Sequence, residues 1–161
     1  AAQQLERQRA NHTLSRVYLA LAEGHWTNQS KSGLIDRPIE KVPECFNRYQ
    51  VADTGRPSRT EYEVLSEFTY EETPFSLVRL KLQTGRTHQI RVHMASLSHP
   101  LLGDSIYGHE GFLGFDRAAL HSFEITCQLP GHQDLAVFSS EMPEDFQKMI
   151  AKSINFSSTL I

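Results

Sequence analysis

Apolar and polar side chains alternate along much of the chain, and this pattern predicts several β-strands. The strand-like segments are residues 15–24, 60–68, 76–83, 119–129 and 135–139. Residues 69–75 contain Pro74 and are predicted to form the loop of a hairpin. The pair Pro130-Gly131 predicts a turn between the last two strands.

Three other segments are predicted to be helical. Residues 1–11 form the first, and residues 88–97 form the second, with Thr87 as its N-terminal cap. The third covers residues 143–153, because a proline is favoured at the first position of a helix and two acidic residues follow it.

The chain of 161 residues is long enough for one domain with a buried core. Residues 25–58 are rich in turn-forming residues, which indicates either a long functional connection or several short strands. The elements do not alternate regularly between strand and helix. We therefore expect an α+β domain with a mainly antiparallel sheet and flanking helices.

Charge is distributed unevenly along the sequence. The chain has 16 Lys and Arg against 19 Asp and Glu, which excludes a strongly basic nucleic-acid-binding protein but not a local basic patch. Residues 73–103 contain no acidic residue, but they include Arg79, Lys81, Arg86 and Arg91. This window indicates either a phosphate-binding patch or a solvated strand with an arginine that pairs with a distant carboxylate.

Several common chemistries lack their sequence signals. Five of the eight histidines lie within residues 88–121, but His88 and His93 are five positions apart and face different sides of a helix. A metal site is therefore not expected. The sequence also contains no GxSxG motif and no GxGxxG or GxxxxGK[ST] phosphate-binding loop.

Localisation signals are equally sparse. No apolar run is long enough for a transmembrane helix, and the first residues lack the apolar stretch of a signal peptide. The two cysteines, Cys45 and Cys127, are too few for a disulfide framework, and we expect inert, reduced thiols. These features predict a cytoplasmic protein.

One long segment resembles a known protein family. Residues 82–95 read LQTGRTHQIRVHMA, and SHPLLGD at 98–104 and YG at 107–108 follow. This order is similar to the TGRTHQIRVHxA…HPLxGDxxYG signature of the RluA-type RNA pseudouridine synthases. Shorter matches occur in the family's order: RVYLAL at 16–21, LIDRPI at 34–39, GRPSRTEY at 55–62, RAALH at 117–121 and MPEDF at 142–146.

The resemblance implies a fold and an activity. Residues 1–161 would be the C-terminal portion of a pseudouridine synthase catalytic domain, with no second domain in this chain. The family isomerises uridine to pseudouridine in structured RNA, so ribosomal or transfer RNA is the expected partner. The reaction involves no redox step, and no cofactor, metal or membrane is expected. The target uridine has to leave the base stack before it can react.

The resemblance also assigns roles to individual residues. Tyr18 matches the active-site tyrosine, Arg91 the arginine that orients the nucleophilic carboxylate, and Leu120 the apolar residue beneath the uracil. Arg86 and His88 are expected either to contact phosphate or to hold the start of the helix. Two further residues, Arg79 and Lys81, are weaker candidates for contacts with the RNA backbone.

The family's nucleophile is an aspartate in the motif HRLDxxTSG, which precedes the position of Tyr18. The motif does not occur in this sequence, so the nucleophile is expected upstream of Ala1 and the chain alone is expected to be inactive. No aspartate of the chain is expected to replace the nucleophile, because each falls in a loop or in a segment that matches another element of the family. Asp104 belongs to GDxxYG, where a structural role is expected. The aspartates are Asp36, Asp53, Asp104, Asp116, Asp134 and Asp145.

Two alternatives to the enzyme remain open at this point. The chain could belong to an RNA-binding relative that lacks the nucleophile. It could also be an inactive fragment whose sheet is completed by another chain. The resemblance implies a sheet that uses strands from both halves of the domain, so we expect this portion alone to expose a sheet edge and apolar surface.

Overall fold

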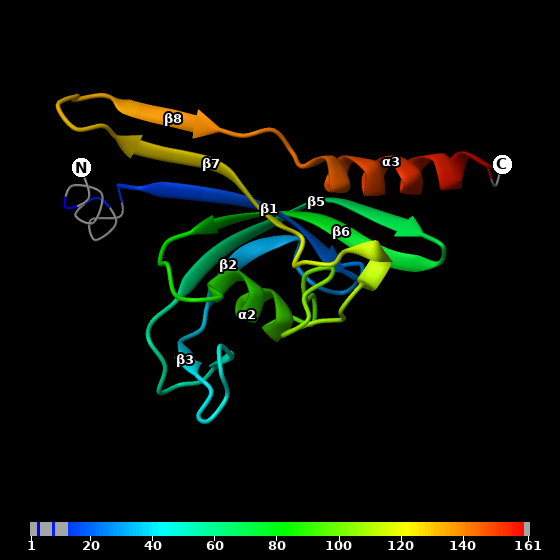
Figure 1. The fold of residues 1–161 in the computed structure, drawn as a ribbon, viewed down its shortest axis with the longest axis horizontal. Helices are drawn as coiled ribbons and strands as arrows, with labels where there is room; N and C mark the ends of the chain where they lie inside the picture. The colour runs from blue at the N-terminus through cyan, green and yellow to red at the C-terminus, as the bar shows by residue number, and fades with distance from the viewer. Residues whose placement is uncertain (1–2, 4–7, 9–12, 160–161) are drawn as a thin grey trace.

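The structure is a computed structural model that describes residue 3, residue 8 and residues 13–159, with side chains described as far as Ile154 (Figure 1). The helix predicted over residues 1–11 lies outside the described residues, apart from residues 3 and 8.

A six-stranded sheet forms the centre of the described chain, in the order β2-β5-β6-β1-β7-β8. Every neighbouring pair in it is antiparallel. The α+β class with an antiparallel sheet is therefore confirmed. The six strands are β1 (Ser15–Glu23), β2 (Ser32–Asp36), β5 (Arg59–Tyr70), β6 (Thr73–Leu82), β7 (Leu120–Gln128) and β8 (Leu135–Ser139).

The turn-rich segment 25–58 contains several short strands, which decides between the two alternatives left open by its sequence. One is β2 of the main sheet, and the other two form a separate two-stranded sheet. The latter are β3 (Ile39–Lys41) and β4 (Tyr49–Val51), which pair antiparallel as a small hairpin below the main sheet in Figure 1.

Helices cover both faces of the sheet. On one face, helix α2 (Gln89–Ser96) packs Ile90 and Met94 against Ala20 of β1 and Leu80 of β6. Helix α3 (Glu144–Thr159) covers part of the other face, where a second cluster includes Leu19, Leu21, Phe75, Leu77, Phe146 and Met149. The two clusters follow from the alternation of side chains along β1.

The hairpin between β5 and β6 is tighter than predicted. Both strands continue to the pair Tyr70 and Thr73, so that only Glu71 and Glu72 form the turn. Pro74 lies within β6 rather than in a loop. Proline is tolerated near the first residue of a strand, where a ladder hydrogen bond is least missed.

Helix α2 begins differently from the prediction. Its N-terminal cap is His88 in the left-handed conformation (φ 55°), with no side-chain capping bond, so Thr87 as the cap is wrong. The buried side chain of Gln89 holds the preceding loop instead. Its Oε1 accepts hydrogen bonds from Thr84 Oγ1 (2.8 Å) and from the Arg86 N–H (3.0 Å).

The remaining connections carry few regular elements. A short 3-10 helix, η1 (Phe112–Gly114), lies in the loop between α2 and β7, and α3 starts one residue after Pro143. Cys45 is exposed and Cys127 is buried, and both are free thiols. Among the described residues, no helix is both long and apolar enough to cross a membrane.

Candidate active site

A cavity of about 220 Å³ lies where β1, β6 and β7 meet the start of α2. Its walls include Tyr18 from β1 and Leu120 from β7, on the sheet face that α2 covers. Arg86, His88 and Arg91 come from the loop and first turn of α2. The cavity therefore brings together five of the seven residues selected from the sequence.

Arg91 is held in place by a buried carboxylate. Its Nε and Nη2 donate to the two oxygens of Asp104 at 2.7 and 2.6 Å. The Asp104 side chain is 0% exposed, and that of Arg91 is 18% exposed. Such a two-point contact orients a guanidinium group more firmly than a single bond. Donation to the Asp104 carboxylate also raises the pKa of Arg91.

Asp104 is itself fully hydrogen-bonded. Its Oδ1 also accepts the backbone N–H groups of Ile106 (3.0 Å) and Tyr107 (3.1 Å). Burial alone raises the pKa of this carboxyl, but the bonds from Arg91 and the two N–H groups hold it below its usual value. A carboxylate that is buried and bonded at both oxygens orients its partner, and it is poorly placed to attack a substrate.

His88 and Tyr107 extend this network. Arg91 Nη1 lies 3.1 Å from His88 Nε2, and an arginine can only donate, so His88 accepts at Nε2 and carries its proton on Nδ1. His88 Nδ1 lies 3.0 Å from Tyr107 Oη, which also accepts the backbone N–H of Tyr49 (2.9 Å). Burial and the nearby Arg91 lower the pKa of His88, which favours this neutral form.

Arg79 and Lys81 are not brought to the cavity. Strand side chains alternate, so these two residues face away from Leu80 and Leu82, which lie on the α2 side. Arg79 lies 3.7 Å from Glu63. Of the two interpretations of this window, the structure shows the pairing of arginine with a carboxylate, since Arg91 and Arg79 each contact one. Arg86 is exposed at the cavity, and its contact with phosphate stays a prediction.

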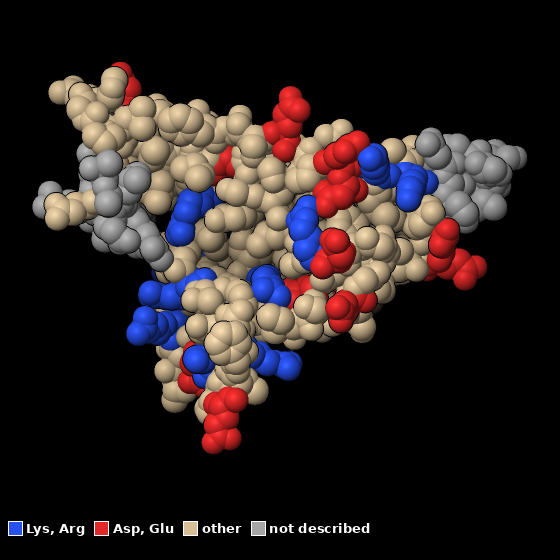
Figure 2. All heavy atoms as spheres, in the orientation of Figure 1, with Lys and Arg blue, Asp and Glu red and all other residues tan. Residues whose placement is uncertain are grey.

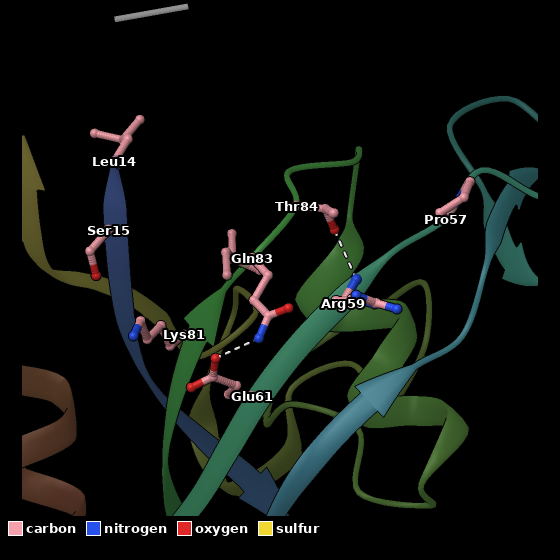
Figure 3. A pocket seen from close by; sticks show the side chains of 9 residues that line it. Leu14, Ser15, Pro57, Arg59, Glu61, Lys81, Gln83 and Thr84 are labelled. Atoms are coloured by element: carbon pink, nitrogen blue, oxygen red, sulfur yellow. Dashed lines mark hydrogen bonds between the residues drawn. The ribbon is translucent and has the colours of Figure 1, made fainter. Parts of the chain in front are cut away.

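Lys81 lines a larger hollow of about 470 Å³ on the main sheet (Figure 3). Arg59 and Glu61 of β5 and Gln83 also line it, and Gln83 Nε2 donates to Glu61 Oε1 at 2.6 Å. Its polar side chains are partly paired with one another, and it contains neither Tyr18 nor Arg91. The candidate site is therefore the smaller cavity.

Two residues of the site were missed from the sequence. Asp104 was assigned a structural role only, and Tyr107 had no role, although both belong to the GDxxYG match. Residues 73–103 contain no acidic residue, so an arginine in this segment was expected to pair with a distant carboxylate. That expectation could have pointed to Asp104. The partner could not be chosen from spacing alone, because thirteen positions separate it from Arg91.

The cavity combines an apolar floor with a polar rim. Tyr18, Leu82 and Leu120 supply flat or apolar surface, and Arg86 and Arg91 supply donors. Such a site suits a planar ring that is attached to an anionic group. In the described part of the chain, no group of three His, Cys, Asp or Glu side chains is arranged to hold a metal ion.

Known proteins resemble this chain in sequence. The family model described as RNA pseudouridylate synthase matches residues 1–96. Ribosomal large subunit pseudouridine synthase D of Nitrosomonas europaea is 36% identical, over 91% of this chain and 43% of that protein. The RNA pseudouridine synthase YhcT of Bacillus subtilis is 39% identical, over 90% of this chain and 46% of that protein. The chain thus spans less than half the length of these relatives.

Solved structures resemble it as well. Human RNA pseudouridylate synthase domain containing 1 matches 87% of this chain and 59% of its own, with a TM-score of 0.71 and 29% identity. Human RNA pseudouridylate synthase domain containing 4 matches with a TM-score of 0.69 at 19% identity, over 94% of this chain and 66% of its own, and shows the shared fold alone. The family expected from the sequence is confirmed: this chain belongs to the RluA-type RNA pseudouridylate synthases.

Proposed function

We propose that the protein containing this chain is a cytoplasmic enzyme that isomerises uridine to pseudouridine in structured RNA. Ribosomal RNA is the favoured substrate, because several relatives are named as ribosomal large subunit synthases. The chain is then the C-terminal portion of the catalytic domain. The observation that carries the proposal is the cavity that gathers Tyr18, Arg91 and Leu120 in a chain of this family.

The chemistry rearranges one nucleoside without net oxidation. The bond from C1′ to N1 of the base breaks, and a bond from C1′ to C5 forms. N1 gains a proton and C5 loses one. A carboxylate assists departure at the glycosidic carbon, as in other covalent catalysis at such centres. The uridine first leaves the stack, at a cost of a few kcal/mol that contacts in the cavity offset.

The residues of the cavity fit these steps. Tyr18 stacks on the flipped base and lies where the C5 proton is removed, while Leu120 packs beneath the uracil. Arg91 holds the nucleophilic aspartate ionised and aimed, and this aspartate comes from the part of the protein upstream of Ala1. Arg86 and His88 lie at the rim of the cavity, where Arg86 is available to a phosphate.

The hydrogen bonds of Arg91 support a nucleophilic carboxylate other than Asp104. A guanidinium group has five N–H donors, and its described partners, Asp104 and His88, use three of them. The other two are available to a second carboxylate. Asp104 is therefore the residue that orients Arg91, and it leaves donors for the aspartate that reacts.

The substitution Arg91→Ala in the whole protein, with its natural upstream sequence, tests this proposal. We expect pseudouridine formation in ribosomal RNA to fall by at least about 10²–10³-fold, because an oriented charge at the reacting centre is lost. Pseudouridine is detected by carbodiimide modification and primer extension. Lys152→Ala, on the exposed surface of α3, is the control and should retain full activity.

Two results would contradict the proposal. Near-normal turnover in Arg91→Ala would remove the role assigned to this arginine. A wild-type protein that binds RNA but forms no pseudouridine in it would instead favour the RNA-binding relative without catalysis.

A further inference from the structure

A second hollow, of about 440 Å³, lies between the β3–β4 hairpin and the loop that precedes α2. We call it the hairpin groove, and its charged lining residues are Glu40, Lys41, Arg56 and Arg86. Arg86 also lines the candidate active-site cavity. The hairpin groove and the cavity are therefore adjacent, with one arginine between them.

The basic side chains of the groove are exposed, and the described part of the chain offers them no carboxylate partner. Among the described residues, neither Lys41, Arg56 nor Arg86 forms an ion pair, whereas Arg59, Arg79 and Arg117 each contact a carboxylate. Figure 2 shows Lys and Arg side chains gathered over β3 and the region beside α2, while acidic side chains are more frequent toward α3. Exposed cations that form no ion pair and outnumber the acidic residues along a groove favour a polyanionic partner.

The one acidic residue among these four is fixed by neighbours in β4 and in the turn that follows β4. Glu40 accepts hydrogen bonds from Thr54 Oγ1 (2.7 Å) and Gln50 Nε2 (3.1 Å). Both bonds lower the pKa of this half-buried carboxyl, so it stays ionised near neutral pH. Glu40 therefore places a negative charge beside the basic residues, where it limits the affinity for an anion.

The hairpin is tied directly to the Arg91 network. The backbone N–H of Tyr49, in β4, donates to Tyr107 Oη, and the rings of Tyr49 and His88 meet edge to face with centroids 5.7 Å apart. A ligand in the groove is thus held at a defined position relative to Arg91.

We propose that the hairpin groove binds the RNA backbone next to the target uridine, with phosphates on Lys41, Arg56 and Arg86. The nucleoside between these phosphates and Arg91 then enters the cavity. This inference rests on the proposed function, because it takes RNA as the substrate. RNA is favoured over other polyanions because the groove shares Arg86 with a cavity that suits a planar base.

The test measures binding of a fluorescein-labelled stem–loop RNA by anisotropy, over about 50–300 mM KCl, with the whole protein. In the double variant Lys41→Gln/Arg56→Gln we expect binding about three- to tenfold weaker. The slope of log K against log salt is negative, and its magnitude should decrease by about 0.7–0.9 for each phosphate that the variant no longer neutralises. Lys152→Gln on α3 removes the same kind of charge elsewhere and should change neither quantity.

Glu40→Gln supplies an independent test of opposite sign. Removal of this negative charge should tighten RNA binding by about two- to fivefold at low salt, and the effect should vanish at high salt. The variant keeps an oxygen that accepts from Thr54. It therefore tests the groove even if the double variant does not fold, which circular dichroism will show.

The outcomes separate the two proposals. If Lys41→Gln/Arg56→Gln and Glu40→Gln bind as tightly as wild type while pseudouridine still forms, the groove inference is overturned and the enzyme assignment stands. If the wild-type protein neither binds the RNA nor forms pseudouridine, both are overturned. Support requires a raised KM for RNA in the double variant, with kcat retained at saturating RNA.

Discussion

At the scale of single residues, the pair Arg91 and Asp104 organises the candidate site. Four N–H groups point at one buried carboxylate, so its charge is compensated without water. The arrangement links the loop at 104–107 to the first turn of α2. Removal of one partner of such a pair leaves the other charge buried and uncompensated.

Asp104→Asn tests the strength of this pair. The amide can no longer accept two N–H bonds from the guanidinium, and we expect the free energy of unfolding to fall by about 3 kcal/mol. Pseudouridine formation should fall as well, because Arg91 loses its orientation. Urea denaturation and the pseudouridine assay measure the two effects.

The matched control is Asp116→Asn, which changes an exposed aspartate in the loop before β7. Its free energy of unfolding should stay within about 0.5 kcal/mol of wild type. Equal stability of the Asp104 and Asp116 variants would show that the buried pair contributes nothing to the fold.

At the scale of elements, the β5–β6 hairpin shows where a local pattern predicts poorly. The two strands and their pairing were expected, but the turn was placed over seven residues. Glu71 and Glu72 instead turn the chain in two residues, with φ of 47° and 63°. Both lie in the left-handed region that two-residue hairpins require and that Asn and Gly adopt most easily.

Replacement of the turn by Asn-Gly should therefore stabilise the protein. We expect Glu71→Asn/Glu72→Gly to raise the free energy of unfolding by about 1–2 kcal/mol, because the strain of two left-handed non-glycine residues is relieved. Thermal denaturation measures the gain as a higher Tm. Glu71→Gln/Glu72→Gln removes the charges without easing the backbone, so a similar gain in that variant would contradict the explanation.

Helix α2 shows a related limit. Its existence follows from the sequence, and so does its place at the site. Its first residue does not, because His88 adopts a left-handed conformation that local propensity does not favour. The His88 ring contacts Arg91 and Tyr107, and Gln89 is hydrogen-bonded to the loop before the helix. These contacts compensate for the left-handed conformation of His88.

At the scale of the whole molecule, the sheet ends in an open edge. Strand β8 pairs only with β7 in the described chain, and Leu135 and Val137 are 62% and 61% exposed. Phe138 of β8 and Ile125 of β7 are also exposed. The expectation of an exposed edge and apolar surface is thus confirmed. Such an edge favours pairing with another strand.

A lysine in this edge should therefore reduce association of the chain. We expect the isolated chain to associate as its concentration rises in sedimentation velocity runs, and Val137→Lys to shift it toward monomer, because a charged edge residue opposes strand pairing. Gln29→Lys adds the same charge to an exposed loop and should not change association. A wild-type chain that stays monomeric at all concentrations would contradict the prediction.

Period-two patterns predicted the long strands and helix-start signals predicted helices α2 and α3, since these elements depend on local sequence. The order of these elements then predicted the α+β class. The resemblance supplied the family and five residues that meet in one cavity. The tertiary structure alone decided that Asp104 pairs with Arg91, which face of β6 borders the cavity, and that the β3–β4 hairpin lies beside it. Those outcomes depend on which distant segments pack together, and local spacing does not encode that.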